Sequence, residues 1–200
     1  MAQNLQQLAD GSAVFRTSEG KNSLEIGSGQ GTVGTTSGLS ITSELKGAIH
    51  KTVIALNAVS VTITDNGTAG GQGSVKLYDF PEGLITFLGA TANVAITESG
   101  GVNNTAAVLA AIGSAAVGAG DATLSSTEAD MIPSTSCTLT SSLGTFAGKS
   151  TTALLATFDG TATALDAYLN FAVSDASTTA NATLSLTGSV TLVWVNCGDV

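Results

Sequence analysis

Regular alternation of apolar and polar residues is the feature that most constrains the fold of this chain. It is clearest in two stretches, residues 165–174 and residues 183–194. Successive side chains of a β-strand point to opposite faces of a sheet, so a period of two indicates strands with one buried face. Gly188 interrupts the second stretch, and we expect a bulge or a bend there. The apolar sets are Leu165, Ala167, Leu169, Phe171 and Val173, then Leu184, Leu186, Val190, Leu192 and Trp194.

Other segments have strand character as well. Residues 59–64 alternate and run into the sequence TDNG, which is a strong turn signal. The alanines of residues 104–117 favour a helix, whereas Gly113 and its neighbours favour a strand in a tightly packed sheet, and we predict a strand. Further strands are predicted at residues 49–56, 74–80, 83–97 and 151–160.

One short helix is predicted at residues 125–133. Ser125 and Glu128 have the spacing of a capping box, and Pro133 is expected to end the helix after about two turns. Charged residues make up only 10% of the chain, so the Glu, Lys and Arg that stabilise exposed helix faces are scarce. Many strands, turn residues between them and almost no helix predict an all-β fold, an antiparallel β-sandwich or jelly-roll-like body.

The N-terminal 45 residues differ from the rest. Residues 20–38 contain six glycines and only short apolar stretches. Such a segment has high chain entropy and few side chains to bury, so we predict an extended Gly/Ser-rich arm at residues 1–45 and a sandwich body at residues 46–200, which should fold without the arm. The alternative is an N-terminal hairpin within the same domain. An arm could order on a partner by adding strands to a sheet edge, and its candidate contacts are Leu24, Ile26, Val33, Leu39 and Ile41.

The charge of the chain is unevenly distributed. The formal net charge is −9, yet residues 1–51 hold four basic and four acidic residues and are neutral. Residues 52–200 hold two basic and eleven acidic residues. An acidic body repels phosphate, so direct binding of nucleic acid is not expected.

The sequence GTFAGKST at residues 144–151 resembles a nucleotide-binding P-loop but fails its spacing. A P-loop needs four residues between its first glycine and the Gly-Lys-Ser/Thr, and here there are three, with Leu143 in place of the first glycine. We predict that residues 151–160 form a strand rather than the helix of a P-loop. Lys149 is predicted to lie in a solvated turn.

Residues suited to catalysis or metal binding are scarce. His50 is the one histidine, no GxSxG sequence occurs, and Cys137 and Cys197 lack metal-ligand spacing. Aspartates at turns, such as Asp65 and Asp159, could offer oxygen ligands to calcium, but none lies in an EF-hand-like run. We therefore expect no catalytic residues, no cofactor and no metal, and two free thiols, with a disulfide between Cys137 and Cys197 as the alternative.

The sequence predicts neither an export signal nor a membrane-spanning segment. The N-terminal residues MAQNLQQLADG lack a basic region followed by an apolar core, and no apolar run approaches the ~18 residues of a transmembrane helix. These features predict a soluble product made in the cytoplasm, with no membrane partner.

Four segments resemble the head decoration, or cement, proteins of tailed bacteriophages. They are HKTVIALNAVSVTITD (50–65), KLYDFPEG (76–83), FDGTATALDAYLNFAVSD (158–175) and ATLSLTGSVTLVWVNCGD (182–199). The resemblance implies a compact β fold that binds the major capsid protein on the outer face of the virion and staples neighbouring capsomers. It also implies a homodimer or homotrimer, which the apolar character of the chain favours (mean hydropathy +0.35). The resemblance carries no catalytic residues.

Other classes of protein make different predictions. A carbohydrate-binding or host-recognition module of the virion would expose a cluster of Tyr78, Tyr168 or Trp194. A glycosidase would need two carboxylates in one cleft, which fifteen acidic residues could supply. The glycosidase is disfavoured because sugar-binding clefts generally use aromatic platforms, whereas aromatic residues such as Phe87 and Phe171 fall on apolar strand faces, as core residues do. A bacterial surface or pilus-like protein would need an export signal.

Overall fold

The computed structural model describes residues 4–7, 13–16, 24–25, 30–46, 49–120, 122–151, 157–160, 162–163 and 165–198. Within these residues the chain is almost entirely antiparallel β-sheet, with three single 3-10 turns and no α-helix. The all-β fold class is thus confirmed. The strands are β1 (Asn4–Gln7), β2 (Ala13–Arg16), β3 (Leu24–Glu25), β4 (Thr32–Val33), β5 (Leu39–Lys46), β6 (Ile49–Asp65), β7 (Gly71–Asp79), β8 (Gly83–Val102), β9 (Ala107–Gly113), β10 (Ile132–Thr138), β11 (Leu143–Lys149), β12 (Thr157–Gly160), β13 (Asp166–Val173) and β14 (Thr178–Asn196).

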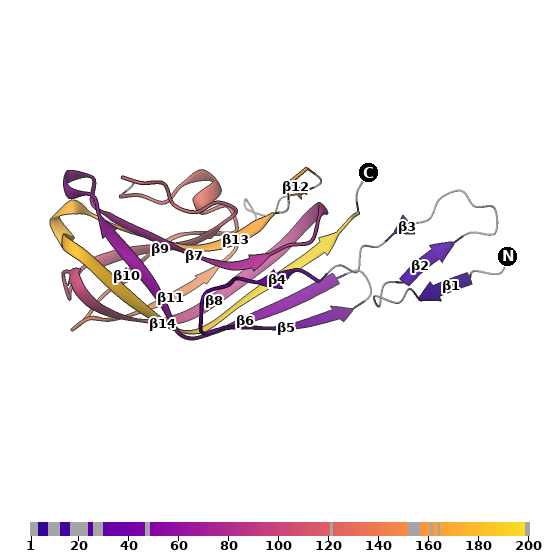
Figure 1. Ribbon diagram of the computed structural model, residues 1–200, viewed down its shortest axis with the longest axis horizontal. Coiled ribbons are helices and arrows are strands. Elements are labelled where there is room, and N and C mark those ends of the chain that lie inside the picture. Colours follow the sequence, from indigo (N-terminus) through magenta and orange to yellow (C-terminus); the bar gives the residue numbers. More distant parts are fainter. Residues whose placement is uncertain are drawn as a thin grey trace.

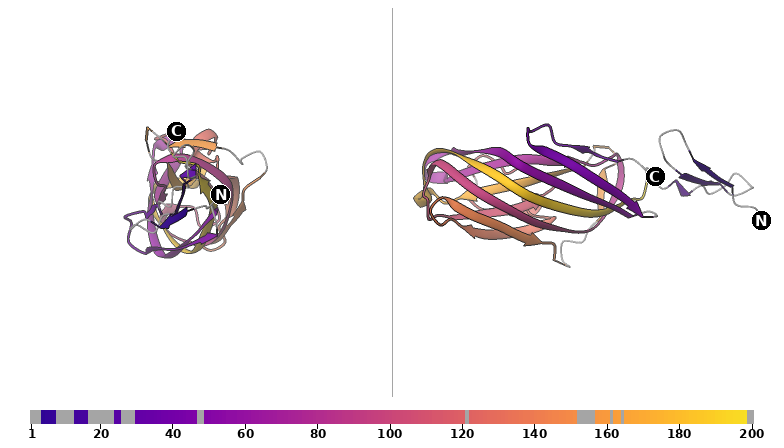
Figure 2. Two further views of the ribbon diagram at one scale, coloured as in Figure 1. Left: turned by 90° about the vertical axis from the view of Figure 1, so that its right-hand side faces the viewer. Right: turned by 90° about the horizontal axis from the view of Figure 1, so that it is seen from below.

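Eleven strands form one sheet that folds over on itself (Figures 1 and 2). Its order is β10-β9-β13-β7-β6-β14-β8-β11, with β4 added to β7, β5 to β6 and β12 to β8. We call β10-β9-β13-β7 the first layer and β5-β6-β14-β8-β11 the second layer. The layers are joined where the end of β6 pairs with the start of β7, at Thr64–Gln72 and Asp65–Gly71. Strands β1, β2 and β3 form a separate small sheet.

The apolar residues of the alternating strands point into the space between the two layers and form the hydrophobic core there. Leu184, Leu186, Val190, Leu192 and Trp194 of β14 are all fully buried, and so are alternate residues of β6 and β8. The register of β14 against β6 shifts between Leu186 and Gly188, because Asn57 and Ala58 of β6 lie opposite Thr187. The bulge expected at Gly188 is therefore next to it, on β6, and Gly188 itself pairs regularly with β8. One face of three strands, each 17 to 20 residues long, is buried, which removes a large apolar area from water. The hydrophobic free energy gained in this way is the dominant favourable contribution to folding.

The far edges of the two layers also meet. The Ser150 hydroxyl donates a hydrogen bond to the carbonyl of Met131 at 2.5 Å, which links the end of β11 to the start of β10. Thr140 and Leu143 form an isolated bridge in the turn between the same two strands. The sandwich is therefore nearly closed along this side, which is one way to protect sheet edges from pairing with other chains.

The helix predicted at residues 125–133 is wrong. The capping box of Ser125 and Glu128 does form, but it caps only a three-residue 3-10 turn, Ser126–Glu128. The chain then enters β10, which contains Pro133. Proline is tolerated there because β10 is an edge strand, and its pairing with β9 is irregular between Ile132 and Thr135. The strand predicted within residues 104–117 is confirmed as β9.

Residues 30–38, which we call the cover segment, belong to the sheet although they lie within the predicted arm. Strand β4 pairs with Tyr78 and Asp79 of β7, and β5 pairs along its whole length with β6. Glycine is needed for this close approach. A Cβ atom on Gly34 would lie 1.9 Å from the carbonyl oxygen of Lys76, and one on Gly31 would lie 2.0 Å from that of Asp79.

Candidate functional site

The cover segment lies along the edge where the two layers meet, and it contacts the buried side chain of Tyr78 there. The amide of Gly31 donates a hydrogen bond to the Tyr78 hydroxyl at 2.8 Å. Tyr78 is fully buried. Burial raises the pKa of its hydroxyl, and hydrogen bonds with Thr52, Gly31 and Ser43 oppose that rise. The tyrosine thus connects β7, the cover segment and the second layer.

An aromatic cluster lies behind Tyr78. The Trp194 ring stacks on His50 with centroids 3.9 Å apart and meets Phe80 edge-on at 5.3 Å. Its Nε1 donates to the Thr52 hydroxyl at 3.1 Å, so the indole has a buried polar partner. Because Trp194 and Tyr78 are fully buried, neither belongs to an exposed aromatic platform.

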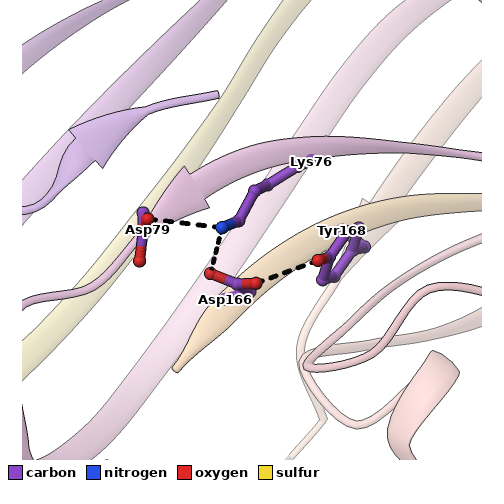
Figure 3. Close-up of polar contacts among 4 residues, drawn as sticks. All are labelled: Lys76, Asp79, Asp166 and Tyr168. Carbon is purple, nitrogen blue, oxygen red and sulfur yellow. Dashed lines mark hydrogen bonds and ion pairs between the residues drawn. The ribbon is translucent and has the colours of Figure 1, made fainter. Parts of the chain in front are cut away.

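A polar cluster lies on the outer surface of the first layer (Figure 3). Lys76 Nζ lies 2.7 Å from Asp166 and 3.3 Å from Asp79, and the Tyr168 hydroxyl donates to Asp166 at 2.9 Å. The hydrogen bond to Asp166 raises the pKa of Lys76, which therefore stays protonated. Burial, then the hydrogen bond to Asp166, raises the pKa of Tyr168. A protonated lysine held between two carboxylates is a poor nucleophile, so this cluster is suited to joining β7 to β13.

The loop between β9 and β10 covers the rest of that outer surface. It is held by Asn170 of β13, which is fully buried. The side-chain amide of Asn170 donates to the carbonyls of Ala115 and Glu128, both at 2.8 Å. Its oxygen accepts from the amide of Val117 at 3.1 Å and from the Ser74 hydroxyl at 2.7 Å. The buried amide is fully satisfied, and it fixes the loop at two points.

The outer surface of the second layer has no such cover among the described residues. A hollow of about 460 Å³ opens on it, lined by Leu88, Lys149, Thr191 and Val193 among others. Lys149 is the last residue of β11, not a turn residue as we predicted. The amide of Ser150 donates to Ala90, and its hydroxyl accepts from the Ala90 amide. Since this part of GTFAGKST pairs like a strand, its amides do not converge on a phosphate.

The predicted arm contacts fall in different places. Leu39 and Ile41 are half-buried and pack against the main core, and Val33 of β4 is half-buried. Leu24 begins β3, and Ile26 lies outside the described residues. Their role in partner binding stays a prediction.

Within the described residues, the cysteine, histidine and acidic side chains do not gather into a reactive or metal-binding site. Both cysteines are free, with Cys137 buried and Cys197 exposed, and burial raises the pKa of the Cys137 thiol to about 11. Among the residues that the structure describes, no three His, Cys, Asp or Glu side chains come together as a metal site. Sequence reasoning missed the cluster around Lys76 and the role of Asn170. The same-face spacing of Asp166 and Tyr168 was the available signal.

Comparison of the sequence with protein-family models gives no match, and no curated protein matches it. Among solved structures, one described as "CBM4 structure and function" is similar at 17% identity and a TM-score of 0.34, over 78% of this chain and 91% of that one. At these values the likeness carries no argument about function. Within the described part of the chain, no helix is both long enough and apolar enough to cross a membrane.

Proposed function

We propose that this chain is a structural protein of a bacteriophage virion that binds the outer surface of the capsid and stabilises contacts between capsomers. One observation carries the proposal. The four segments that resemble head decoration proteins cover β13, most of β6 and β14, and the last four residues of β7, and these strands are consecutive neighbours in the sheet. The resemblance therefore follows one contiguous structural unit rather than scattered turns.

The physical properties of the body support this role. Long paired strands make a stiff unit that keeps its shape under load, because each strand is held on both sides over many residues. The acidic body stays soluble before assembly and repels packaged nucleic acid. Many copies on a symmetric shell multiply modest affinities into firm attachment. The role requires no catalysis, cofactor or metal.

Co-sedimentation with capsids that lack the protein tests the proposal. Purified protein should bind saturably, at a fixed ratio to the major capsid protein, and should raise the temperature at which the shells break. Serum albumin, which is also acidic, is the control for non-specific binding to the shells. Absence of binding to both immature and expanded shells would contradict the proposal, and binding to a glycan array in the same preparation would favour a carbohydrate- or host-recognition module instead.

A further inference from the structure

The two outer surfaces of the sandwich differ in a way that the capsid-binding proposal does not explain. The first layer is covered by the loop between β9 and β10 and by the cluster around Lys76. The outward side of the second layer, which we call the open face, has neither among the residues that the structure describes. In the right-hand view of Figure 2 its strands lie side by side, with β14 (yellow) between β6 and β8.

The open face is weakly charged and partly apolar. Among the outward-facing residues of β6, β14, β8 and β11, the charged ones are Lys51 and Lys149. Glu44 on the neighbouring β5 lies 3.8 Å from Lys51. Ile49 is 44% exposed and Leu88 is 40% exposed, which is high for large apolar side chains. Apolar groups on a surface with few charges are typical of contact surfaces.

The strand registers place these residues in two rows across the open face. Glu44, Lys51, Val193 and Gly89 form one row across β5, β6, β14 and β8. Thr42, Val53, Thr191, Thr91 and Lys149 form the next row, which ends on β11. Glu44 and Lys149 therefore lie at opposite margins of the layer, one row apart, with β14 midway between them. Ile49 on β6 and Leu88 on β8 lie on either side of β14, and both lie just beyond the first row, on the side away from the second row.

We infer that a second copy of this chain packs on the open face, with a two-fold axis that runs along β14. Such an axis places β11 of the partner subunit over β5, and β8 of the partner subunit over β6. Glu44 then lies diagonally opposite Lys149 of the partner subunit, one row away along the strands and beside the hollow that Lys149 lines. Ile49 faces Leu88 of the partner subunit. Each contact occurs twice, as an isologous interface requires.

Charge and area favour a second copy as the occupant. A chain of net charge −9 repels its own copies wherever acidic surfaces meet, but the open face brings opposite charges together across the axis. β14 pairs with both β6 and β8 from Ala182 to Trp194, and β5 and β11 add eight and seven residues at the margins. At about 4.8 Å between strands and about 3.3 Å per residue, this surface covers roughly 850 Å². That is about the area each partner contributes to an interface of standard size.

Sedimentation equilibrium of the purified full chain tests this geometry without any capsid, so its result is independent of the proposed function. The chain should be a dimer at micromolar concentration, and Leu88→Lys should raise the dimer Kd about tenfold or more because it faces Ile49 and Lys51 of the partner subunit. Leu143→Lys is the matched control. Leu143 is also exposed on the second layer, at 58%, but it lies in the row of Thr97, beyond the end of β5.

A charge exchange tests the axis itself. Glu44→Lys and Lys149→Glu should each weaken the dimer, and the double variant should restore it because the opposite charges again face each other. A monomer or a trimer for the unchanged protein would overturn the inference. So would a double variant no tighter than the single variants, or a Leu143→Lys variant as weak as Leu88→Lys, provided that circular dichroism shows each variant folded.

Discussion

At the residue scale, the aromatic side chains serve the core. Alternation placed Trp194 among the apolar residues of its strand, and the structure confirms this, since the ring is fully buried between His50 and Phe80. The side of the strand on which Trp194 lies could be predicted from the sequence, because a strand has only two faces. It could not give the hydrogen bond to Thr52, whose partner lies 142 residues away in the chain.

Replacing Trp194 should test this packing most directly. Trp194→Ala removes the ring that touches His50, Phe80 and Tyr78 and leaves a cavity, so we expect the free energy of unfolding to fall by about 3–5 kcal/mol. Urea unfolding followed by circular dichroism measures the change. Tyr168→Ala is the control, because Tyr168 is half-buried and lies outside the hydrophobic core, so its loss should cost far less. Equal stability of Trp194→Ala and the unchanged protein would show that the ring does not hold the core together.

At the scale of elements, the cover segment shows where composition misleads. Its glycines were interpreted as chain flexibility, but Gly31 and Gly34 are positions where two backbones approach too closely for a side chain. Both situations select glycine, and sequence alone does not separate them. The short helix failed for a related reason. A capping box is a local signal, and it was satisfied by a single turn before β10 began.

Gly34→Ala distinguishes close packing from flexibility. The added Cβ would meet the carbonyl of Lys76, so the cover segment must shift, and we expect a loss of about 1–3 kcal/mol with faster hydrogen exchange at residues 31–34. Gly118→Ala is the matched control, since the nearest atom to its added Cβ is 4.0 Å away. If the glycines serve flexibility alone, Gly34→Ala should be neutral or slightly stabilising.

At the scale of the whole molecule, alternation was enough to predict the fold class. Each strand of the core carries its own signal, and an antiparallel sandwich is the simplest way to bury many one-sided strands. The contrast between the two outer surfaces was not predictable. It depends on contacts between distant residues, such as Lys76 with Asp166 and Asn170 with Ala115, and no local pattern reveals those pairs.

Two truncations test the predicted division of the chain at residue 45. Removal of residues 1–29 should leave the stability of the body unchanged within about 0.5 kcal/mol, because β1–β3 pair only among themselves in the described part. Removal of residues 1–45 also deletes the cover segment and all of β5 except Lys46, so we expect a loss of about 3 kcal/mol or more, a large share of a typical domain's stability. Thermal and urea unfolding of both proteins give the comparison, and equal stability would support an arm that ends at residue 45.

The positions of the chain ends have a practical consequence. The chain enters the body beside Asp79 and leaves it near Gly198, whose carbonyl accepts a hydrogen bond from Leu84, so both ends lie at one end of the sandwich (Figure 1). The turn at Gly67–Ala69 lies at the opposite end, and the space around the Cβ position of Gly67 is empty. A peptide epitope inserted in that turn would be presented to solvent at the far tip, while tags joined to the termini would stay at the other pole. The molecule is in this sense a ready scaffold with separate sites for immobilisation and for display.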